Sequence, residues 1–114
     1  MTPAKTAITQ LGNHNIITLK EPITYQNFKE LEDCIEGVAG KSQTAIILEC
    51  KAVGYMDSAA LEMLLRLQEK VRERGMQLKI VSLNAVCRDI MIVTRLINQF
   101  TVHASVQEAI KEPL

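Results

Sequence analysis

The segment from Thr44 to Gly75 constrains the fold of this chain most strongly. Its first seven residues, Thr44–Cys50, are almost continuously apolar, as in a central strand that is covered on both faces. After a short loop, Asp57 and Ser58 precede a leucine-rich stretch with helical spacing, and Gly75 is a residue type common just after a helix. The segment therefore predicts a strand, a tight loop and a helix over 58–74, with the Ser58 hydroxyl at the start of that helix.

The residues before this segment predict a hairpin and a helix. Apolar and polar residues alternate in Ala7–Leu11 and in Asn15–Leu19, and the residues between them favour a turn. From Thr24 the apolar residues recur at helical spacing, so we expect a helix with Thr24 as its N-cap and a stop at Gly37 or Gly40.

The residues after the segment predict two more strands and two more helices. We expect a strand over Gln77–Leu83, a helix over Val86–Thr94 with Ile90 and Val93 facing inward, and a short strand over 100–103. A final helix should start at Ser105, with Glu108 completing a capping box. Strands that alternate with helices after an opening hairpin imply an α/β fold. We expect one domain over 1–114, a mixed sheet of about four to five strands and about four helices.

Charge and composition exclude several classes of protein. Thirteen basic and thirteen acidic residues give zero formal charge, which argues against a nucleic-acid-binding protein and against a polybasic membrane-surface segment. No apolar run approaches the roughly 20 residues of a membrane span, and the first residues lack the apolar core of a signal peptide. Cys34, Cys50 and Cys87 have no paired spacing and suggest reduced thiols, so we expect a cytoplasmic protein.

The usual signatures of enzymes are missing from the sequence. It contains no phosphate-binding glycine loop and no nucleophile elbow around Ser58. His14 and His103 have no helical partner at i, i+4, and the cysteines lack the spacing of metal ligands. We therefore expect no catalytic residues, no cofactor and no metal, and we do not expect an enzyme.

Asp57 and Ser58 allow two interpretations. An aspartate or serine before an apolar helical run is what any N-cap requires, and from the local pattern alone capping is the better interpretation. The same position also suits regulation, because a hydroxyl at the positive end of a helix is a place where a charge can be added or removed.

The order of these elements, together with the residues around Ser58, resembles the STAS domain family, and in particular the bacterial anti-sigma factor antagonists. The resemblance covers nearly the whole chain. It is strongest in Ala45-Ile46-Ile47-Leu48 to Met56-Asp57-Ser58, Val71-Arg72-Glu73-Arg74-Gly75, Leu78 to Leu83, Thr94 to Phe100, and Ser105-Val106-Gln107-Glu108-Ala109.

The resemblance implies a mechanism of partner switching that regulates transcription. An anti-sigma factor with serine kinase activity would phosphorylate Ser58, the serine directly after the aspartate. The unphosphorylated chain would bind that anti-sigma factor and free the sigma factor, the phosphorylated chain would let go, and a serine phosphatase would reset it. The resemblance thus implies a phosphoprotein with partner-binding residues Tyr55, Met56, Asp57, Ser58, Ala59 and Glu62.

The sequence departs from the family pattern at three places. Ala59-Ala60 replaces a second small hydroxyl residue and a glycine, and Arg95 stands where the family has a glycine. Near the end of the second strand, Glu21 and Thr24 stand where the family has a glycine and an aspartate. A second hypothesis therefore stays open, in which the chain is a STAS scaffold or adaptor that is not phosphorylated, in a signalling or lipid-transport complex.

Overall fold

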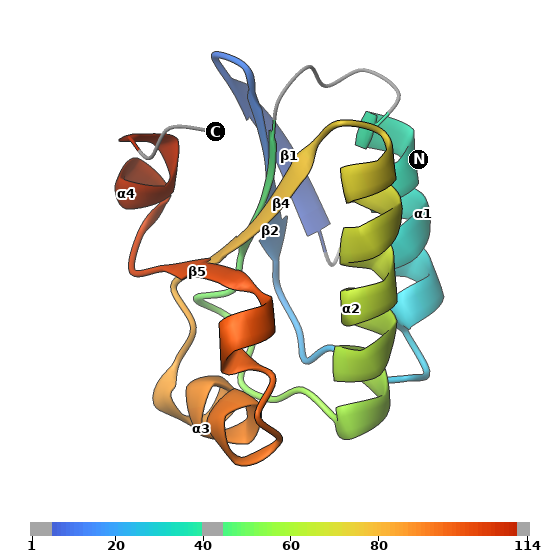
Figure 1. The fold of residues 1–114 in the computed structure, drawn as a ribbon, viewed down its shortest axis with the longest axis vertical. Helices are drawn as coiled ribbons and strands as arrows, with labels where there is room; N and C mark the ends of the chain where they lie inside the picture. Colours follow the sequence, from blue (N-terminus) through green and yellow to red (C-terminus); the bar gives the residue numbers. More distant parts are fainter. Residues whose placement is uncertain (1–5, 40–44, 112–114) are drawn as a thin grey trace.

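A computed structural model describes residues 6–39 and 45–111 of the chain. In this part of the chain five strands and four α-helices alternate after an opening hairpin, with one turn of 3₁₀ helix, η1, near the end (Figure 1). The elements are β1 (Thr6–Leu11), β2 (His14–Leu19), α1 (Phe28–Ala39), β3 (Ala45–Glu49), α2 (Ser58–Glu73), β4 (Gln77–Val81), α3 (Ala85–Val93), η1 (Ile97–Gln99), β5 (Thr101–His103) and α4 (Val106–Lys111). The predicted α/β fold with a mixed sheet is confirmed.

The five strands form one sheet in the order β1-β2-β3-β4-β5. β1 pairs with β2 in antiparallel orientation, and the other neighbours are parallel. The predicted hairpin closes through a two-residue turn in which Gly12 has a φ of 59° and Asn13 has a negative φ. This is the type II′ pattern, which needs glycine at its first central position.

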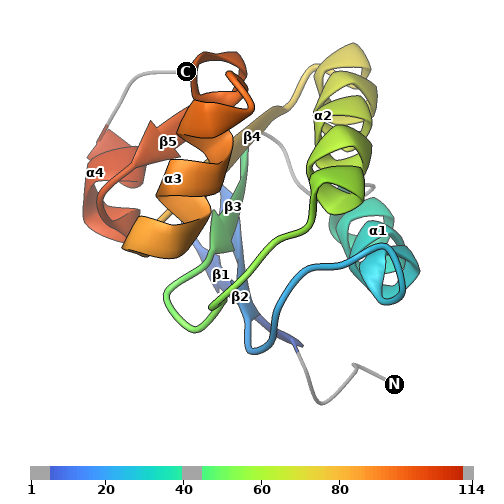
Figure 2. The same ribbon diagram turned by 90° about the horizontal axis from the view of Figure 1, so that it is seen from below.

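The helices cover the two faces of the sheet unequally. α1 and α2 lie side by side on one face, and α4 lies on the other (Figures 1 and 2). The main core lies under α1 and α2, because apolar side chains of β2, β3 and β4 alternate toward them; it includes Ile17, Ile46, Leu48, Leu64 and Ile80, all at most 1% exposed. A smaller cluster of Ile16, Ile47, Val81 and Ala109 lies under α4.

One charged side chain is fully buried on the α4 face. Lys79 of β4 is 0% exposed, and its Nζ donates to the backbone oxygen of Ala109, 2.6 Å away. Ala109 lies in the last turn of α4, where carbonyl groups lack helical partners and favour a positive charge. This hydrogen bond from Lys79 thus holds α4 against the sheet.

The predicted boundaries differ from the observed ones where a local turn makes an element start later or end earlier than expected. Thr24 is not the N-cap of α1, because residues 24–27 form a separate turn in which the Asn27 N–H donates to the Thr24 oxygen at 3.3 Å. Gly37 lies within α1, and Gly40 and Thr44 lie outside the described residues. β4 stops at Val81 because Ser82 has a φ of 62°, which a strand cannot accommodate.

Candidate functional site

Ser58 is the first residue of α2 and is exposed. The N-cap is Asp57, in extended conformation with φ −87° and ψ 165°. The capping interpretation is therefore confirmed for Asp57, while Ser58 stands just inside the helix. Among the described residues, no hydrogen bond occupies the Ser58 hydroxyl, so this group is available to a molecule in solution.

The two carboxylate oxygens of Asp57 hold two different elements. Oδ1 accepts from the backbone N–H of Ala60 at 2.7 Å, which is the capping bond. Oδ2 accepts from the backbone N–H of Tyr25 at 3.1 Å, in the loop between β2 and α1. Two backbone bonds reinforce this link, from Ile23 N–H to the Tyr55 oxygen at 3.0 Å and from Asp57 N–H to the Ile23 oxygen at 3.2 Å. The β2–α1 loop and the start of α2 are thus tied together.

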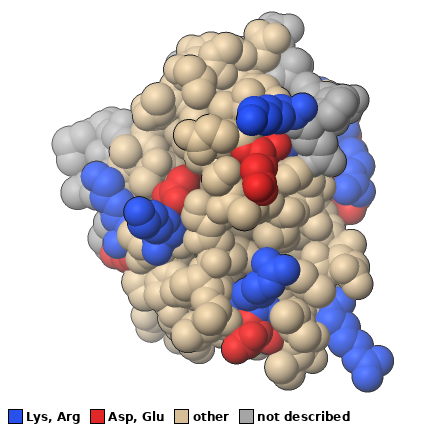
Figure 3. All heavy atoms as spheres, turned by 90° about the vertical axis from the view of Figure 1, so that its left-hand side faces the viewer, with Lys and Arg blue, Asp and Glu red and all other residues tan. Residues whose placement is uncertain are grey.

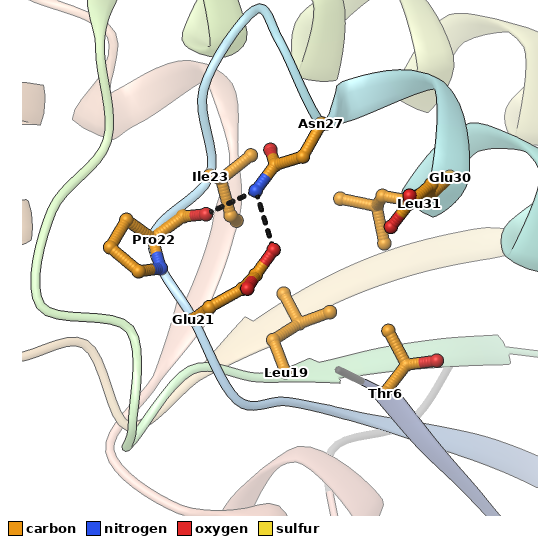
Figure 4. Close-up of a pocket in the computed structure, with 8 residues that line it drawn as sticks. All are labelled: Thr6, Leu19, Glu21, Pro22, Ile23, Asn27, Glu30 and Leu31. Atoms are coloured by element: carbon orange, nitrogen blue, oxygen red, sulfur yellow. Dashed lines mark hydrogen bonds between the residues drawn. The ribbon is translucent and has the colours of Figure 1, made fainter. Parts of the chain in front are cut away.

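The side chain of Asn27 stabilises the β2–α1 loop through hydrogen bonds to other residues of the loop (Figure 4). Its Nδ2 donates to Glu21 Oε1 at 2.9 Å and to the Pro22 oxygen at 2.8 Å, and its Oδ1 accepts from the Thr24 N–H at 2.9 Å. The carboxylate of Glu21 is therefore engaged with Asn27. The cavity beside these residues measures about 20 Å³, enough for about one water molecule and too small for an organic substrate.

The start of α3 is joined to the loop that precedes Ser58. Asn84 caps α3 by accepting from the Cys87 N–H at 2.8 Å, and its Nδ2 donates to the Val53 oxygen at 3.0 Å. The Cys87 thiol also lies 3.4 Å from that oxygen. Burial raises the pKa of the Cys87 and Cys50 thiols, so they stay protonated and unreactive at neutral pH.

The loops after β2, β3 and β4 leave the carboxyl ends of parallel strands, so they meet at one end of the sheet, which we call the Ser58 end. In Figure 2 this end faces the viewer, with α3 beside the loop that leads into α2. Five of the seven exposed large apolar side chains of the described residues belong to its loops and to α3. They are Tyr25, Tyr55, Val86, Ile92 and Val93. This end of the domain is therefore the candidate site for contact with another protein, since exposed apolar side chains that form a patch usually mark such a site.

The six predicted partner-binding residues do not all reach this surface. Ser58, Ala59 and Glu62 are exposed, Asp57 is half-buried, and Tyr55 is 48% exposed. The expectation that Met56 lies on this surface is corrected, because its side chain is 1% exposed and belongs to the main core. It lies there because Met56 pairs with Ile23 in an isolated β-bridge, which turns its side chain inward.

Sequence reasoning missed the contribution of α3 to the Ser58 end. The prediction that Val93 faces inward is wrong, since Val93 is 80% exposed, whereas Ile90 is half-buried against the core as expected. The inward residues of α3 are Cys87 and Met91, both 0% exposed. A signal was present: this nine-residue helix has more large apolar residues than one face can bury.

The described residues provide little for other kinds of chemistry. Nowhere in 6–39 and 45–111 do three His, Cys, Asp or Glu residues group in a way that could hold a metal ion. Among the helices of these ranges, none has the length and apolar character needed to cross a bilayer. Figure 3, which shows the side that carries α4, has scattered Lys and Arg but no continuous basic area of the kind that follows a phosphate backbone.

Comparison with known proteins gives the class of this domain. The sequence matches the profile of the STAS domain over residues 5–109. No curated protein matches it significantly. The chain belongs to the STAS domain family.

Solved structures with the same fold include regulators and part of a transporter. A putative anti-sigma factor antagonist, tm1081 from Thermotoga maritima, is similar with a TM-score of 0.84 at 16% identity, over 95% of this chain and 93% of that one. The anti-sigma factor antagonist SpoIIAA in its unphosphorylated form gives 0.74 at 15%, over 92% of each chain. Murine Solute Carrier 26 family member A9, an anion transporter, gives 0.73 at 17%, over 90% of this chain but 18% of that one. At these identities the similarity shows the fold.

Proposed function

We propose that this chain is an anti-sigma factor antagonist that acts by partner switching in the cytoplasm. Unphosphorylated, it binds an anti-sigma factor that is also a serine kinase, and phosphorylation of Ser58 releases it. The observation that carries this proposal is the position of Ser58: an exposed hydroxyl at the start of α2, without a hydrogen bond among the described residues, at the end of the sheet that also exposes Tyr25 and Tyr55. The chain is then a regulated binding module and not an enzyme.

The first turn of α2 favours a phosphate on Ser58 without loss of the fold. The Asp57 carboxylate satisfies the N–H of Ala60, so the N–H groups of Ser58 and Ala59 still point out of the helix start. Phosphate adds about −1.5 to −2 charge, which the positive end of a helix accommodates. Ala59 and Ala60 also favour the helix more than glycine would, by up to about 1 kcal/mol each.

The same phosphate disfavours a bound partner. Asp57 is the preceding residue and the exposed Glu62 lies one turn further along α2, so three negative groups would share this surface. A partner that packs on Tyr55 would have to remove water from all of them. A loss of roughly 3 kcal/mol in binding would lower the affinity about a hundredfold. This is enough to switch partners.

Phosphorylation in vitro tests the proposal directly. Incubation with ATP and a candidate anti-sigma factor that has serine kinase activity should add one phosphate, which mass spectrometry of peptides assigns to Ser58. Ser58→Ala should abolish the transfer. Transfer of phosphate that Ser58→Ala leaves intact, or no transfer at all, would contradict the proposal.

Binding measurements test the release step. Ser58→Asp should weaken binding to the anti-sigma factor at least tenfold while the thermal midpoint stays within a few degrees, because surface changes usually cost within about 0.5 kcal/mol. Ser105→Asp is a matched control, since Ser105 also stands at a helix start, where its Oγ accepts from the Glu108 N–H at 3.2 Å. This control should not reduce binding.

A second candidate function is a STAS scaffold that is not phosphorylated, in a signalling or lipid-transport assembly. It is favoured by the β2–α1 loop: the one carboxylate of that loop, Glu21, is engaged with Asn27, and Thr24 stands where the family pattern has an aspartate. In this case wild type and Ser58→Ala would retain the same partners in the same amounts after treatment with the kinase and ATP. A phosphorylation-dependent loss of a partner would exclude it.

A further inference from the structure

Within the described ranges 6–39 and 45–111, the two exposed large apolar residues outside the Ser58 end are Ile8 and Leu11, and both lie on β1. β1 is an edge strand, and among the described elements it packs substantially on β2 alone. Its sequence, Thr-Ala-Ile-Thr-Gln-Leu, contains no charge and no proline, and its last four residues are exposed. Soluble proteins usually protect a sheet edge with charged residues or proline, and β1 has neither, so this edge has the character of an interface.

The type II′ turn fixes which backbone groups of β1 point outward. Such a turn is closed by a hydrogen bond between its flanking residues, here Leu11 and His14, which are partners in the register. Hydrogen-bonded and non-bonded pairs then alternate along an antiparallel ladder. Thr9 and Ala7 therefore bond to β2, and the N–H and C=O groups of Thr6, Ile8 and Gln10 face away from the sheet.

We propose that β1 pairs in antiparallel orientation with β1 of a second copy of this chain, joining two sheets of five strands into one of ten. The proposed two-fold axis passes between the two Ile8 residues. Ile8 then faces Ile8 of the second copy, and Thr6 faces Gln10 at either side. Each of these pairs exchanges two backbone hydrogen bonds.

A second copy fits this edge because the strand is complementary to itself. Thr6, Ile8 and Gln10 are the residues whose backbone groups face away from β2, and they are spaced evenly about Ile8. Like charges directly opposite one another destabilise cross-strand pairs. β1 carries no charge, so its pairing with a second copy is free of this repulsion. At the centre, two isoleucine side chains that are each 42% exposed in the monomer cover one another.

The proposed dimer leaves the loop that carries Ser58 free. A two-fold axis perpendicular to the sheet keeps α1 and α2 of both copies on one face. Thr6 of β1 lies beside the β2–α1 loop, but the loops after β3 and β4 follow the third and fourth strands from the paired edge. The dimer would present two Ser58 ends. It is independent of the proposed function, because a dimer can form whether or not Ser58 is phosphorylated.

Sedimentation equilibrium of the full chain tests the proposal. The apparent mass should rise toward twice that of the chain between about 10 µM and 1 mM, the range expected of a small interface. Ile8→Lys places two ammonium groups on the axis and should hold the chain monomeric over the same range. Val93→Lys, which adds the same charge at an 80% exposed site on α3, should leave the association unchanged. A wild type that stays monomeric throughout would overturn the proposal.

Cysteine cross-linking tests the register and does not depend on Ile8→Lys folding well. Residues that form a hydrogen-bonded antiparallel pair have Cα atoms about 5.5 Å apart, which suits a disulfide. Ile8→Cys, in a chain that also carries Cys34→Ser, should therefore form a covalent dimer on mild oxidation. Thr9→Cys in the same background places the two Cα atoms about 8 Å apart and should not. Cross-linking through Thr9→Cys in preference to Ile8→Cys would overturn the proposed pairing.

Discussion

The Oδ2 atom of Asp57 accepts a hydrogen bond from the backbone N–H of Tyr25, with an N···O distance of 3.1 Å, although the two residues are 32 positions apart in the chain. The other oxygen of the same carboxylate caps α2 through Ala60. A residue that local pattern identifies as an N-cap therefore also fixes the loop that lies beside the proposed phosphorylation site. The stability of α2 and the order of this loop are coupled through one side chain.

Two substitutions at Asp57 should separate these roles. Asp57→Ala removes both bonds and should lower the free energy of unfolding by about 1–2 kcal/mol, the usual value of an N-cap. Asp57→Asn keeps one carbonyl oxygen, which can still cap Ala60, but its NH₂ group cannot accept from Tyr25. Urea unfolding should therefore show the smaller loss for Asp57→Asn.

Amide hydrogen exchange identifies the bond that each variant loses. The Tyr25 amide should exchange faster in both variants, and the Ala60 amide faster only in Asp57→Ala. Asp33→Ala is the control, since Asp33 is an exposed residue of α1 paired with Lys29 at 3.2 Å and should cost less than about 0.5 kcal/mol. Equal exchange at Tyr25 in wild type and Asp57→Asn would contradict the coupling.

Arg95 should be replaceable by glycine with a gain in stability. Arg95 has a φ of 64° at the C-terminal end of α3, where the N–H groups of Arg95 and Leu96 bond back to Ile92 and Met91. This left-handed conformation costs residues with a Cβ roughly 1 kcal/mol. Arg95→Gly should therefore raise the free energy of unfolding by up to about 1 kcal/mol, measured by urea denaturation.

α2 provides the matched control, because it ends in the same motif with glycine at the left-handed position. Gly75 has a φ of 77°, and no heavy atom lies within 4 Å of a Cβ built on it. Gly75→Ala should thus lose about 1 kcal/mol through backbone conformation alone. If Arg95→Gly and Gly75→Ala shift stability in the same direction, the backbone explanation fails.

The sequence was sufficient for the elements whose signals are local. The hairpin around Gly12, the buried strand β3 and the cap of α2 at Asp57 depend on turn chemistry, hydrophobic pattern and capping, which residues near in sequence decide. The capping box of α4 was also predicted, with one difference: the Glu108 carboxylate accepts from the Ala104 N–H and not from that of Ser105.

The sequence was insufficient where distant segments decide the outcome. Met56 was expected to contact a partner, but its pairing with Ile23 across two loops turns it into the core. Val93 was expected to face inward, but α3 packs through Cys87 and Met91, because Asn84 anchors its first turn to Val53. Neither contact can be identified from the residues next to it, although the excess of large apolar residues in α3 indicates that some of them are exposed.

The orientation of α3 leads to a paired test. Met91 is 0% exposed, so Met91→Ala should cost about 2–5 kcal/mol, whereas Val93→Ala should cost less than about 0.5 kcal/mol. If α3 contributes to the proposed partner surface, Val93→Asp should also weaken binding to the anti-sigma factor without a change in unfolding. Similar losses of stability from Met91→Ala and Val93→Ala would contradict the observed orientation.

His14 should make the stability of the fold depend on pH in the range where histidine titrates. Burial lowers the pKa of His14 below its usual 6.5, and the positive charge of Lys79 lowers it further. Its Nε2 is buried and has no hydrogen-bond partner among the described residues. The unfolded chain therefore takes up the proton at a higher pH than the folded one, and stability rises with pH in this interval.

The free energy of unfolding should accordingly reach its highest value with respect to His14 above about pH 7.5. It should fall as the pH drops below about 6.5, toward the lowered pKa of the folded state. One proton limits the slope to about 1.4 kcal/mol per pH unit. Urea denaturation between pH 5.5 and 8 measures it. His14→Gln removes the titrating group and keeps a polar side chain, so its profile should be flatter by the contribution of that one proton. Identical profiles for the two proteins would mean that neither burial nor the charge of Lys79 lowers the pKa of His14 in the folded state.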